Sequence, residues 1–161
     1  MTASATARNE GYALLHELVS KQKDVSKILI IKKEKSDVHA VIKEISVVSH
    51  EAAKRLEAFA AQDKSINLKA RGLPLVEEKT RASIESARTK QLLGSSKRKF
   101  ELALLLTQTE ALTYGNHMAK SLAQIETEPQ RRAYLNQLSG QLDGLYVKVL
   151  NLITSHYTQE F

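Results

Sequence analysis

Apolar residues recur along most of the chain at intervals of three and four positions, which is the spacing of an amphipathic helix. The longest strongly apolar segment is residues 100–125. Placed on a helix, it shows one broad apolar arc, formed by Phe100, Leu104, Leu105, Ala111, Leu112, Met118, Ala119, Leu122, Ala123 and Ile125. Leu102 and Leu106 fall outside this arc, so the first half of the segment is apolar on nearly all sides. We therefore expect a central helix that is covered from more than one direction.

A second strong pattern follows Pro129, a residue that suits the first turn of a helix. Its apolar positions are spaced by three and four without interruption and are Leu135, Leu138, Leu142, Leu145, Val149 and Leu152. This spacing is typical of a seam between helices in a bundle. Gly140 and Gly144 lie on another face, where they would let a neighbouring helix approach closely or would only lower the stability of their own helix.

The N-terminal helix begins near Asn9 and leaves two alternatives for its end. Either Asp24 caps a new turn, or the helix continues to about Ile31, because the apolar spacing stays roughly in phase. The run Ile28–Ile31 is apolar on all sides and could also form a short strand. Since no other segment offers a partner strand, we predict a helix there.

Two further helices are predicted in the middle of the chain. The first has Ser36 as its N-cap and ends near Gln62 or Asp63. Its core-facing stripe is Val38, Val41, Ile42, Ile45, Val48, Ala52, Leu56 and Phe59. The second begins at Pro74 and runs to about Leu93. It is unusually polar, and its thin inner stripe is Val76, Thr80, Ile84 and Ala87.

The chain contains few residues that interrupt helices. Its 161 residues include 2 prolines and 6 glycines, and this length suits one domain with its own core. We predict a single domain over residues 1–161, with a flexible tail at 1–8 and a long loop at 64–75. The fold class is all-α: a largely antiparallel bundle of four to six helices around a four-helix core. The helices that begin at Phe100 and Pro129 should form the central hairpin.

The net charge of +6 raises the question of nucleic-acid binding, because phosphates reward clustered cations. The clusters are short and are Lys32, Lys33 and Lys35; Lys97, Arg98 and Lys99; and Arg131 with Arg132. Each lies near the end of a predicted helix, where cations complement the helix dipole at a C-terminus or simply face solvent. We therefore rank nucleic-acid binding third among the functions considered.

Composition also limits the chemistry and the compartment. The chain has no cysteine, which excludes disulfides, thiolate catalysis and metal sites built on thiolates. The first residues lack the apolar core of a secretory signal, and no apolar stretch reaches the length of a membrane span. We expect a cytoplasmic protein without a membrane partner.

Two polar residues, Glu101 and Gln108, fall inside the apolar arc of the central helix. A buried charge or amide is costly unless it has a hydrogen-bond partner, so we expect each to have one. Arg81, Arg88 and Lys90 of the preceding helix are spaced so that one could reach inward. The sequence therefore suggests an ion pair between one of these basic side chains and Glu101.

A second polar line, Glu110, Tyr114 and His117, flanks the same arc. An acid, a phenol and an imidazole on one helical line could bind a metal or move a proton. The alternative, which we favour, is a structural hydrogen-bonded network or a boundary with solvent. The complete candidate polar cluster is Glu101, Gln108, Glu110, Tyr114, His117, Arg81 and Arg88.

Known catalytic and metal-binding motifs are missing. Ferritin-like di-metal sites need a glutamate three residues before a histidine. The positions three residues before the five histidines hold Ala13, Ser36, Val47, Tyr114 and Ile153. The chain also lacks a glycine-rich phosphate loop and a nucleophile elbow, so we assign no catalytic residue, metal or cofactor. In overall pattern, residues 9–153 resemble small bacterial ferritin-like helical-bundle proteins of unknown function, without the ligands of that family.

These observations leave three functions in order of preference. The first is a non-enzymatic bundle that acts by self-association, most simply as a homodimer, or by binding another protein. The excess apolar surface of Leu102, Leu106 and the run Ile28–Ile31 favours it, because such patches seldom stay exposed. The second is a ferritin-like bundle with an atypical metal or small-molecule site in its core. Nucleic-acid binding through the basic patches is the third.

Overall fold

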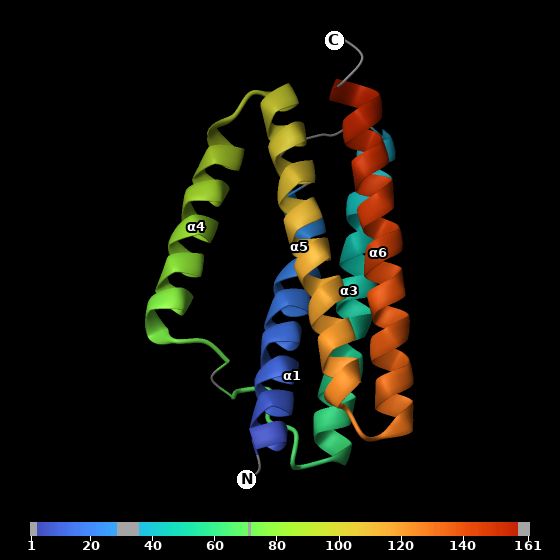
Figure 1. Ribbon diagram of the computed structural model, residues 1–161. Coiled ribbons are helices and arrows are strands. Elements are labelled where there is room, and N and C mark those ends of the chain that lie inside the picture. Colours follow the sequence, from blue (N-terminus) through green and yellow to red (C-terminus); the bar gives the residue numbers. More distant parts are fainter. Residues whose placement is uncertain (1–2, 29–35, 71, 158–161) are drawn as a thin grey trace.

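The all-helical prediction is confirmed by the structure, a computed structural model that describes residues 3–28, 36–70 and 72–157 (Figure 1). Within these residues there are five α-helices, one short 3-10 helix and no strand. The helices are α1 (Ala3–Gln22), η1 (Val25–Lys27, the 3-10 helix), α3 (Ser36–Gln62), α4 (Leu75–Gly94), α5 (Lys97–Ile125) and α6 (Pro129–Tyr157).

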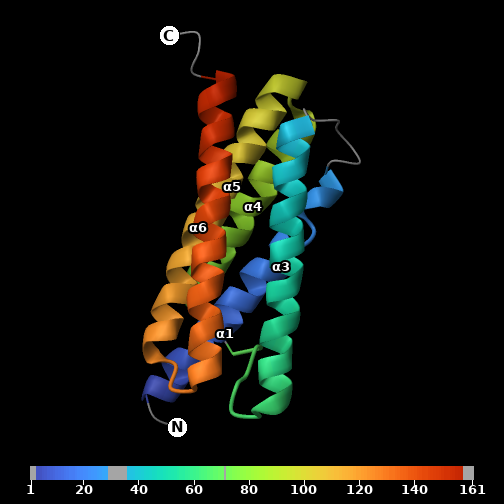
Figure 2. The same cartoon turned by 90° about the vertical axis from the view of Figure 1, so that its right-hand side faces the viewer.

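Four of the helices form the bundle. α1 and α6 each pack on both α3 and α5, so the four helices make a ring in the order α1, α3, α6, α5 (Figure 1, Figure 2). Each helix runs antiparallel to both of its neighbours in this ring. α3 and α5 therefore point in the same direction, and α4 carries the chain back along the length of the bundle between them. The result is a four-helix bundle with one long crossover connection.

The core consists mainly of the stripes that the sequence predicts on α3, α5 and α6, joined by the inner side of α1. Ile125, predicted within the arc of α5, is 38% exposed, because it is the last residue of the helix. The largest fully buried side chains are Tyr12, Leu15, Ile42, Ile45, Leu56, Phe100, Leu104, Leu105, Leu112, Leu122, Leu135 and Leu138. Burying one side chain of this kind stabilises the fold by roughly 1.5–3 kcal/mol. The seam of α6 is buried as predicted, with Leu152 at its end only partly buried.

Several helix boundaries differ from the prediction. α1 begins at Ala3, so residues 3–8 of the predicted tail are helical. It ends at Gln22, and Asp24 then stands at the N-cap of η1, which agrees with the alternative of a new turn. Residues 29–31 of the apolar run Ile28–Ile31 lie outside the described residues. α4 begins at Leu75, with Pro74 at its N-cap rather than in its first turn.

The basic cluster at 97–99 follows the C-terminal end of α4 at Gly94 but lies itself in the first turn of α5. Ser96 occupies the N-cap position, as one of the two predicted caps, but its side chain forms no capping hydrogen bond. Because the helix dipole disfavours cations at this end, helix electrostatics do not explain the cluster. The lysines at 32, 33 and 35 lie outside the described residues.

The predicted inner stripe of α4 is wrong. All four of its members are exposed: Val76, Thr80, Ile84 and Ala87. Val76 is 76% exposed and Ile84 is 46% exposed, whereas Leu92 is buried. The side of α4 that faces α1 and α5 instead carries Arg81, Glu85 and Arg88. The helix is thus turned with its charged side toward the bundle, because α1 and α5 offer charged and aromatic partners there.

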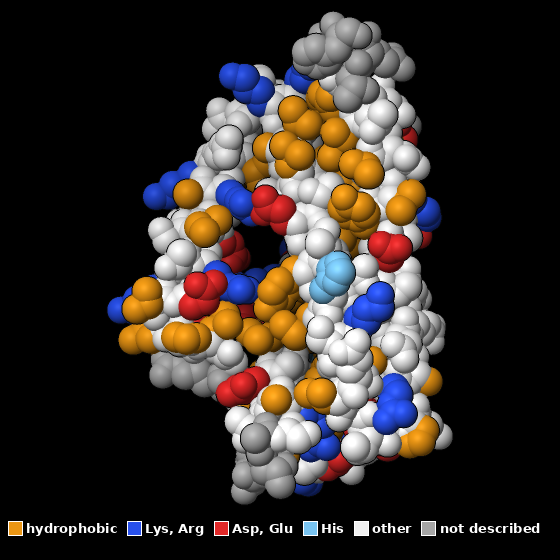
Figure 3. Space-filling view, viewed as in Figure 1, with side chains coloured by type: hydrophobic (Ala, Val, Ile, Leu, Met, Phe, Trp, Pro, Cys, Tyr) orange, Lys and Arg blue, Asp and Glu red, His pale blue; other side chains and the backbone are white. Residues whose placement is uncertain are grey.

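Space remains between α4 and the rest of the molecule. Figure 3 shows an opening between α4 and the bundle, with charged side chains at its edges. Leu106 of α5, which we expected to be covered, is 48% exposed. The central helix is therefore covered by α1, α6 and α4, but not on all sides.

Close helix packing occurs at Gly115 rather than at the two glycines of α6. A β-carbon added to Gly115 would lie 2.9 Å from methyl groups of both Leu142 and Leu18. At Gly140 and Gly144, an added β-carbon would meet no described atom within 4 Å. The idea that these two glycines admit a neighbouring helix is therefore wrong, and only their effect on helix stability remains.

We predict opposite effects of substitution at these positions. Gly115→Val should lower the free energy of unfolding by roughly 2–3 kcal/mol, because it overpacks the contact among α1, α5 and α6. Gly140→Ala should raise it by roughly 0.5–1 kcal/mol, because alanine restricts the unfolded chain and no neighbour obstructs it. Urea unfolding followed by circular dichroism measures both. A tolerated valine at 115 would contradict the packing described here.

Candidate functional site

The two polar residues inside the apolar arc of α5 are buried and have partners, as predicted. Glu101 is 2% exposed and accepts a hydrogen bond of 2.8 Å from the Tyr157 hydroxyl. Its Oε1 also lies 3.2 Å from Nδ1 of His156, whose Nε2 lies 2.9 Å from Asp37 Oδ2. These residues, the Glu101 cluster, join the starts of α3 and α5 to the end of α6.

The partner predicted for Glu101 is wrong. Arg88 Nη1 forms a short ion pair with Glu110 Oε2, and the Arg81 guanidinium lies 5.0 Å from the centre of the Tyr114 ring. Gln108, 3% exposed, accepts its hydrogen bond from Gln22 of α1 at 2.6 Å. Neither arginine is paired with the buried carboxylate, because α4 lies on the outside of the ring and its side chains meet the outer side of α5.

The structure brings together four of the seven candidate residues between α4 and α5. Arg81, Arg88, Glu110 and Tyr114 meet there, and Lys21 of α1 adds a hydrogen bond of 2.9 Å to Glu85. We call these the polar α4 contacts. His117 is exposed and has no hydrogen bond or ion pair within the described part of the chain. The proposed line of acid, phenol and imidazole therefore does not converge on one point.

The polar α4 contacts bind α4 weakly. Arg88, Glu110, Lys21 and Glu85 all have side chains at least 42% exposed, so water screens both ion pairs. An exposed ion pair typically contributes less than about 1 kcal/mol. Leu92 supplies the buried apolar contact of the helix. α4 is thus the least firmly attached helix of the fold.

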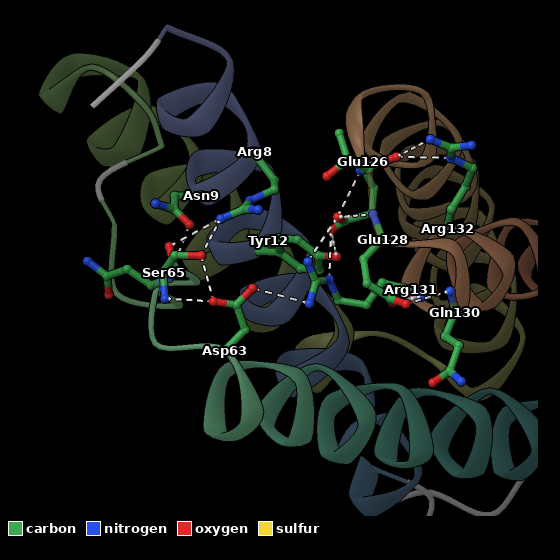
Figure 4. A network of polar contacts seen from close by, with 12 residues as sticks. Arg8, Asn9, Tyr12, Asp63, Ser65, Glu126, Glu128, Gln130, Arg131 and Arg132 are labelled. Atoms are coloured by element: carbon green, nitrogen blue, oxygen red, sulfur yellow. Dashed lines mark hydrogen bonds and ion pairs between the residues drawn. The ribbon is translucent and has the colours of Figure 1, made fainter.

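A polar cluster that the sequence analysis missed lies at the end of the bundle opposite to the Glu101 cluster (Figure 4). Its centre is Glu126, which is 0% exposed in the turn between α5 and α6. Its carboxylate accepts a short hydrogen bond from the Tyr12 hydroxyl and bonds of 3.0 and 3.1 Å from Nε and Nη2 of Arg131. Backbone N–H groups of Thr127 and Glu128 donate to the same carboxylate. A buried charge is thereby fully compensated.

The Glu126 cluster extends to the loop after α3. Arg131 also pairs with Asp63 at 3.2 Å, and Asp63 accepts a hydrogen bond of 2.6 Å from the Ser65 hydroxyl. Ser65 in turn accepts one of 2.8 Å from Arg8. Arg132 donates to the carbonyl oxygen of Glu126 at 2.7 Å. The basic cluster of Arg131 and Arg132 therefore serves the fold, which removes one of the patches considered for nucleic acid.

Ionisation in the Glu126 cluster follows from these contacts. Burial opposes the charge on Glu126, but the hydrogen bonds from Arg131, Tyr12 and the Glu128 N–H outweigh it and lower the pKa to about 2. Burial and the hydrogen bond to Glu126 raise the pKa of Tyr12 well above its usual range. The pair is thus held as carboxylate and neutral phenol at neutral pH. Neither group is poised to exchange a proton.

An open pocket of about 660 Å³ lies beside the Glu126 cluster, against the first turns of α1. Its charged lining residues are the cations Arg8 and Lys64 and the acid Glu10. The charges are thus mixed, and Arg8 donates to Ser65 through Nη2, while its buried Nε has no hydrogen-bond partner among the described residues. The described residues also contain no group of three His, Asp or Glu side chains placed to hold a metal ion.

The sequence around Glu126 contains part of the pattern from which this cluster could have been predicted. Glu126 precedes a helix that starts with Pro129, and an arginine follows five residues after the acid. This spacing favours a local ion pair across the turn. The burial depends on Tyr12, which is 114 positions away and therefore invisible to local patterns.

Replacing Glu126 should reveal its charge in the pH dependence of stability. Its pKa is lowered from 4.5 to about 2, so the charge contributes about 3 kcal/mol above pH 5 and progressively less as the pH falls from 4.5 toward 2. Glu126→Gln should therefore lower the free energy of unfolding by about that amount at pH 7 and by much less near pH 2.5. Glu51→Gln, at an exposed acid of α3, is the control and should show little effect at either pH. A pH-independent difference would argue against the charge as the cause.

The polar α4 contacts should stabilise α4 against local opening but add little to the global free energy of unfolding. Arg88→Ala should lower the global free energy of unfolding by less than about 1 kcal/mol. Amide hydrogen exchange should nevertheless become faster in α4, because its opening requires the loss of few contacts. Glu101→Ala is the comparison and should cost roughly 3 kcal/mol, because it removes a buried carboxylate and leaves the partly buried His156 and Tyr157 without their shared acceptor. Equal protection of α4 and α5 amides would contradict this view of α4.

Comparison of the chain with protein-family models, with curated proteins and with solved structures gave no match. The function of the chain is therefore inferred from its own geometry. The structure has two buried polar clusters that stabilise the fold and one helix, α4, on which Val76 and Ile84 are exposed while Leu92 is buried.

Proposed function

We propose that the chain is a non-enzymatic helical-bundle protein that acts by self-association, and that the outer side of α4 is its contact surface. The observation that carries this proposal is the orientation of α4. Its charged side faces α1 and α5, while its apolar stripe faces away from them. We define the outer α4 face as the predicted stripe of the helix, Val76, Thr80, Ile84 and Ala87, all of which are exposed.

Exposed apolar residues are concentrated on this helix. Among the described residues, nine large apolar side chains are exposed, and four of them (Leu75, Val76, Ile84 and Leu93) belong to α4. Val76 and Ile84 lie on the outer α4 face, whereas Leu75 and Leu93, each nine positions from Ile84, lie on the opposite side of the helix. Single exposed apolar residues are normal, and it is their number on this one helix that favours a contact surface. A helix that bound no partner would gain from polar residues at these positions. Association with a second copy or with another protein would bury them.

A second proposal is a ferritin-like bundle with an atypical metal or small-molecule site. It is supported by the single long crossover, a connection that ferritin-like bundles share. The buried polar groups of α5 weigh against it, because Glu101 and Gln108 are already engaged by His156, Tyr157 and Gln22. Stoichiometric metal in the purified protein would support this proposal over self-association.

We propose a cytoplasmic location, as expected from the sequence. None of the described helices combines the length and apolar character that crossing a membrane requires.

Substitutions on the outer α4 face should weaken self-association without unfolding the bundle. Sedimentation equilibrium of the wild type should show a mass that rises with concentration toward a dimer. Val76→Glu and Ile84→Glu should each raise the dissociation constant at least tenfold, because a carboxylate would be buried in the contact. Val47→Glu, at a 56% exposed position of α3, is the matched control and should leave association unchanged. A wild type that stays monomeric at every concentration would refute the proposal.

A further inference from the structure

The pocket between the first turns of α1 and the loop after α3 is lined by a buried amide with an unused donor. Asn9 projects from α1 toward this loop and is 5% exposed (Figure 4). Its Oδ1 accepts a hydrogen bond of 3.2 Å from the Asn67 N–H, while its amide nitrogen has no hydrogen bond within the described residues. Buried polar groups seldom leave a donor without a partner. Because Asn9 lines the pocket, this donor is available to a molecule inside it.

Arg8, the neighbouring residue of α1, also lines the pocket and is only partly used by the fold. Its Nη2 donates to the Ser65 hydroxyl at 2.8 Å, which anchors the side chain. Its Nε is buried and has no partner among the described residues, whereas buried N–H groups are nearly always bonded. Asp63, the acid of the adjoining Glu126 cluster, pairs with Arg131 and not with Arg8. The guanidinium therefore keeps its charge and a donor that the fold does not satisfy.

The helix geometry leaves room for a ligand group between these two side chains. Ala5 precedes Arg8 by three positions and Asn9 by four, so it lies between them on the helix surface. Its single methyl group does not fill that space. Lys64 lines the same pocket, and its exposed side chain has no ion pair among the described residues. The positive end of the α1 dipole adds to these charges, so an anionic group is favoured over Ala5.

The rest of the lining limits which anion fits. Glu10 lies two positions after Arg8 and therefore at the other edge of the helix face. Two cations and one acid give the lining a net charge of +1, which suits one negative charge. A phosphate group carries about −1.5 to −2 at neutral pH and would be repelled by Glu10. Ile66 and Ala70 offer apolar surface, and a volume of about 660 Å³ suits a small organic molecule.

We propose that this pocket binds a small organic monocarboxylate. The carboxylate accepts hydrogen bonds from the Asn9 amide and the Arg8 guanidinium and faces the Lys64 ammonium group. The apolar part of the ligand lies against Ile66. The site uses no residue of the outer α4 face and is independent of the self-association proposed above.

Nuclear magnetic resonance of the full chain, labelled with nitrogen-15, tests the site with sodium hexanoate as the probe. The side-chain signals of Asn9 Nδ2 and Arg8 Nε should shift saturably, with a dissociation constant in the millimolar range or below. Hexan-1-ol has the same chain without the charge, and sodium phosphate is matched in ionic strength. Both should leave the two signals nearly unchanged. Absence of a saturable shift with hexanoate, or equal shifts with hexan-1-ol, would overturn the proposal.

Two matched lysine variants locate the charge. Lys64→Gln should raise the dissociation constant for hexanoate roughly twofold to fivefold, as expected for the loss of one exposed ion pair. Lys69→Gln makes the same change in the same loop, at an exposed residue outside the pocket lining, and should have no effect. Neither lysine side chain forms a hydrogen bond or ion pair in the described chain, so both variants should fold. Equal affinities of the two variants would count against a carboxylate in this pocket.

An isosteric variant removes the amide donor. Asn9→Asp keeps an oxygen that accepts the hydrogen bond from the Asn67 N–H, but it replaces the unused donor by a negative charge. Binding of hexanoate should be lost, while the melting temperature shows whether the bundle remains folded. Should this variant unfold, the lysine pair decides the question. Unchanged hexanoate binding by folded Asn9→Asp protein would overturn the proposal.

Glu10 provides the test of ligand class. Glu10→Gln should raise the affinity for phosphate, because the lining then carries two cations and no acid. The affinity for hexanoate should change much less. Phosphate binding by the wild type as tight as that of hexanoate would overturn the choice of a monocarboxylate.

Discussion

The rest of the fold depends on the direction in which α3 and α5 run. Both helices run the same way, so a short turn cannot join them, and the chain must travel the length of the bundle in between. α4 makes this connection. Because α1, α3, α6 and α5 already close a ring around the core, a fifth helix can lie only on its outside. There it meets exposed charged side chains of α1 and α5, and its own charged side turns toward them.

Two buried carboxylates near opposite ends of α5 complement the apolar core. Glu126 and Glu101 each lie at a place where the ends of several helices meet. A seam of leucines can be accommodated in more than one register, since dispersion and burial are not directional. A buried charge is stable only where its partners reach it. The carboxylates therefore favour the one alignment in which Tyr12, Arg131 and the end of α6 all come within hydrogen-bond distance.

The same contacts occupy the carboxylates of both clusters. In the described residues, Glu101 accepts a hydrogen bond from Tyr157, and Glu126 accepts hydrogen bonds from Tyr12 and Arg131. The surface of the molecule, and α4 in particular, is therefore the candidate site of function. A helix that is attached by screened ion pairs, bounded by non-helical residues and apolar on its outer side is suited to a change of partner. The proposed self-association through this helix would use a feature that the core does not need.

By itself, the sequence determined the helical class, the core-facing stripes of α3, α5 and α6, and the start of α6 at Pro129. It also identified Glu101 and Gln108 as buried polar groups that need partners. These features depend on the helical period and on the free-energy cost of burying a polar group without a partner. Both can be recognised within a single segment of the sequence. Tertiary structure alone decided which side of α4 faces the bundle, because a thin apolar stripe competes with charges whose partners lie on other helices. It also decided that Arg88 pairs with Glu110 and that Tyr12 covers Glu126, since contacts over 22 and 114 positions depend on how the helices are arranged.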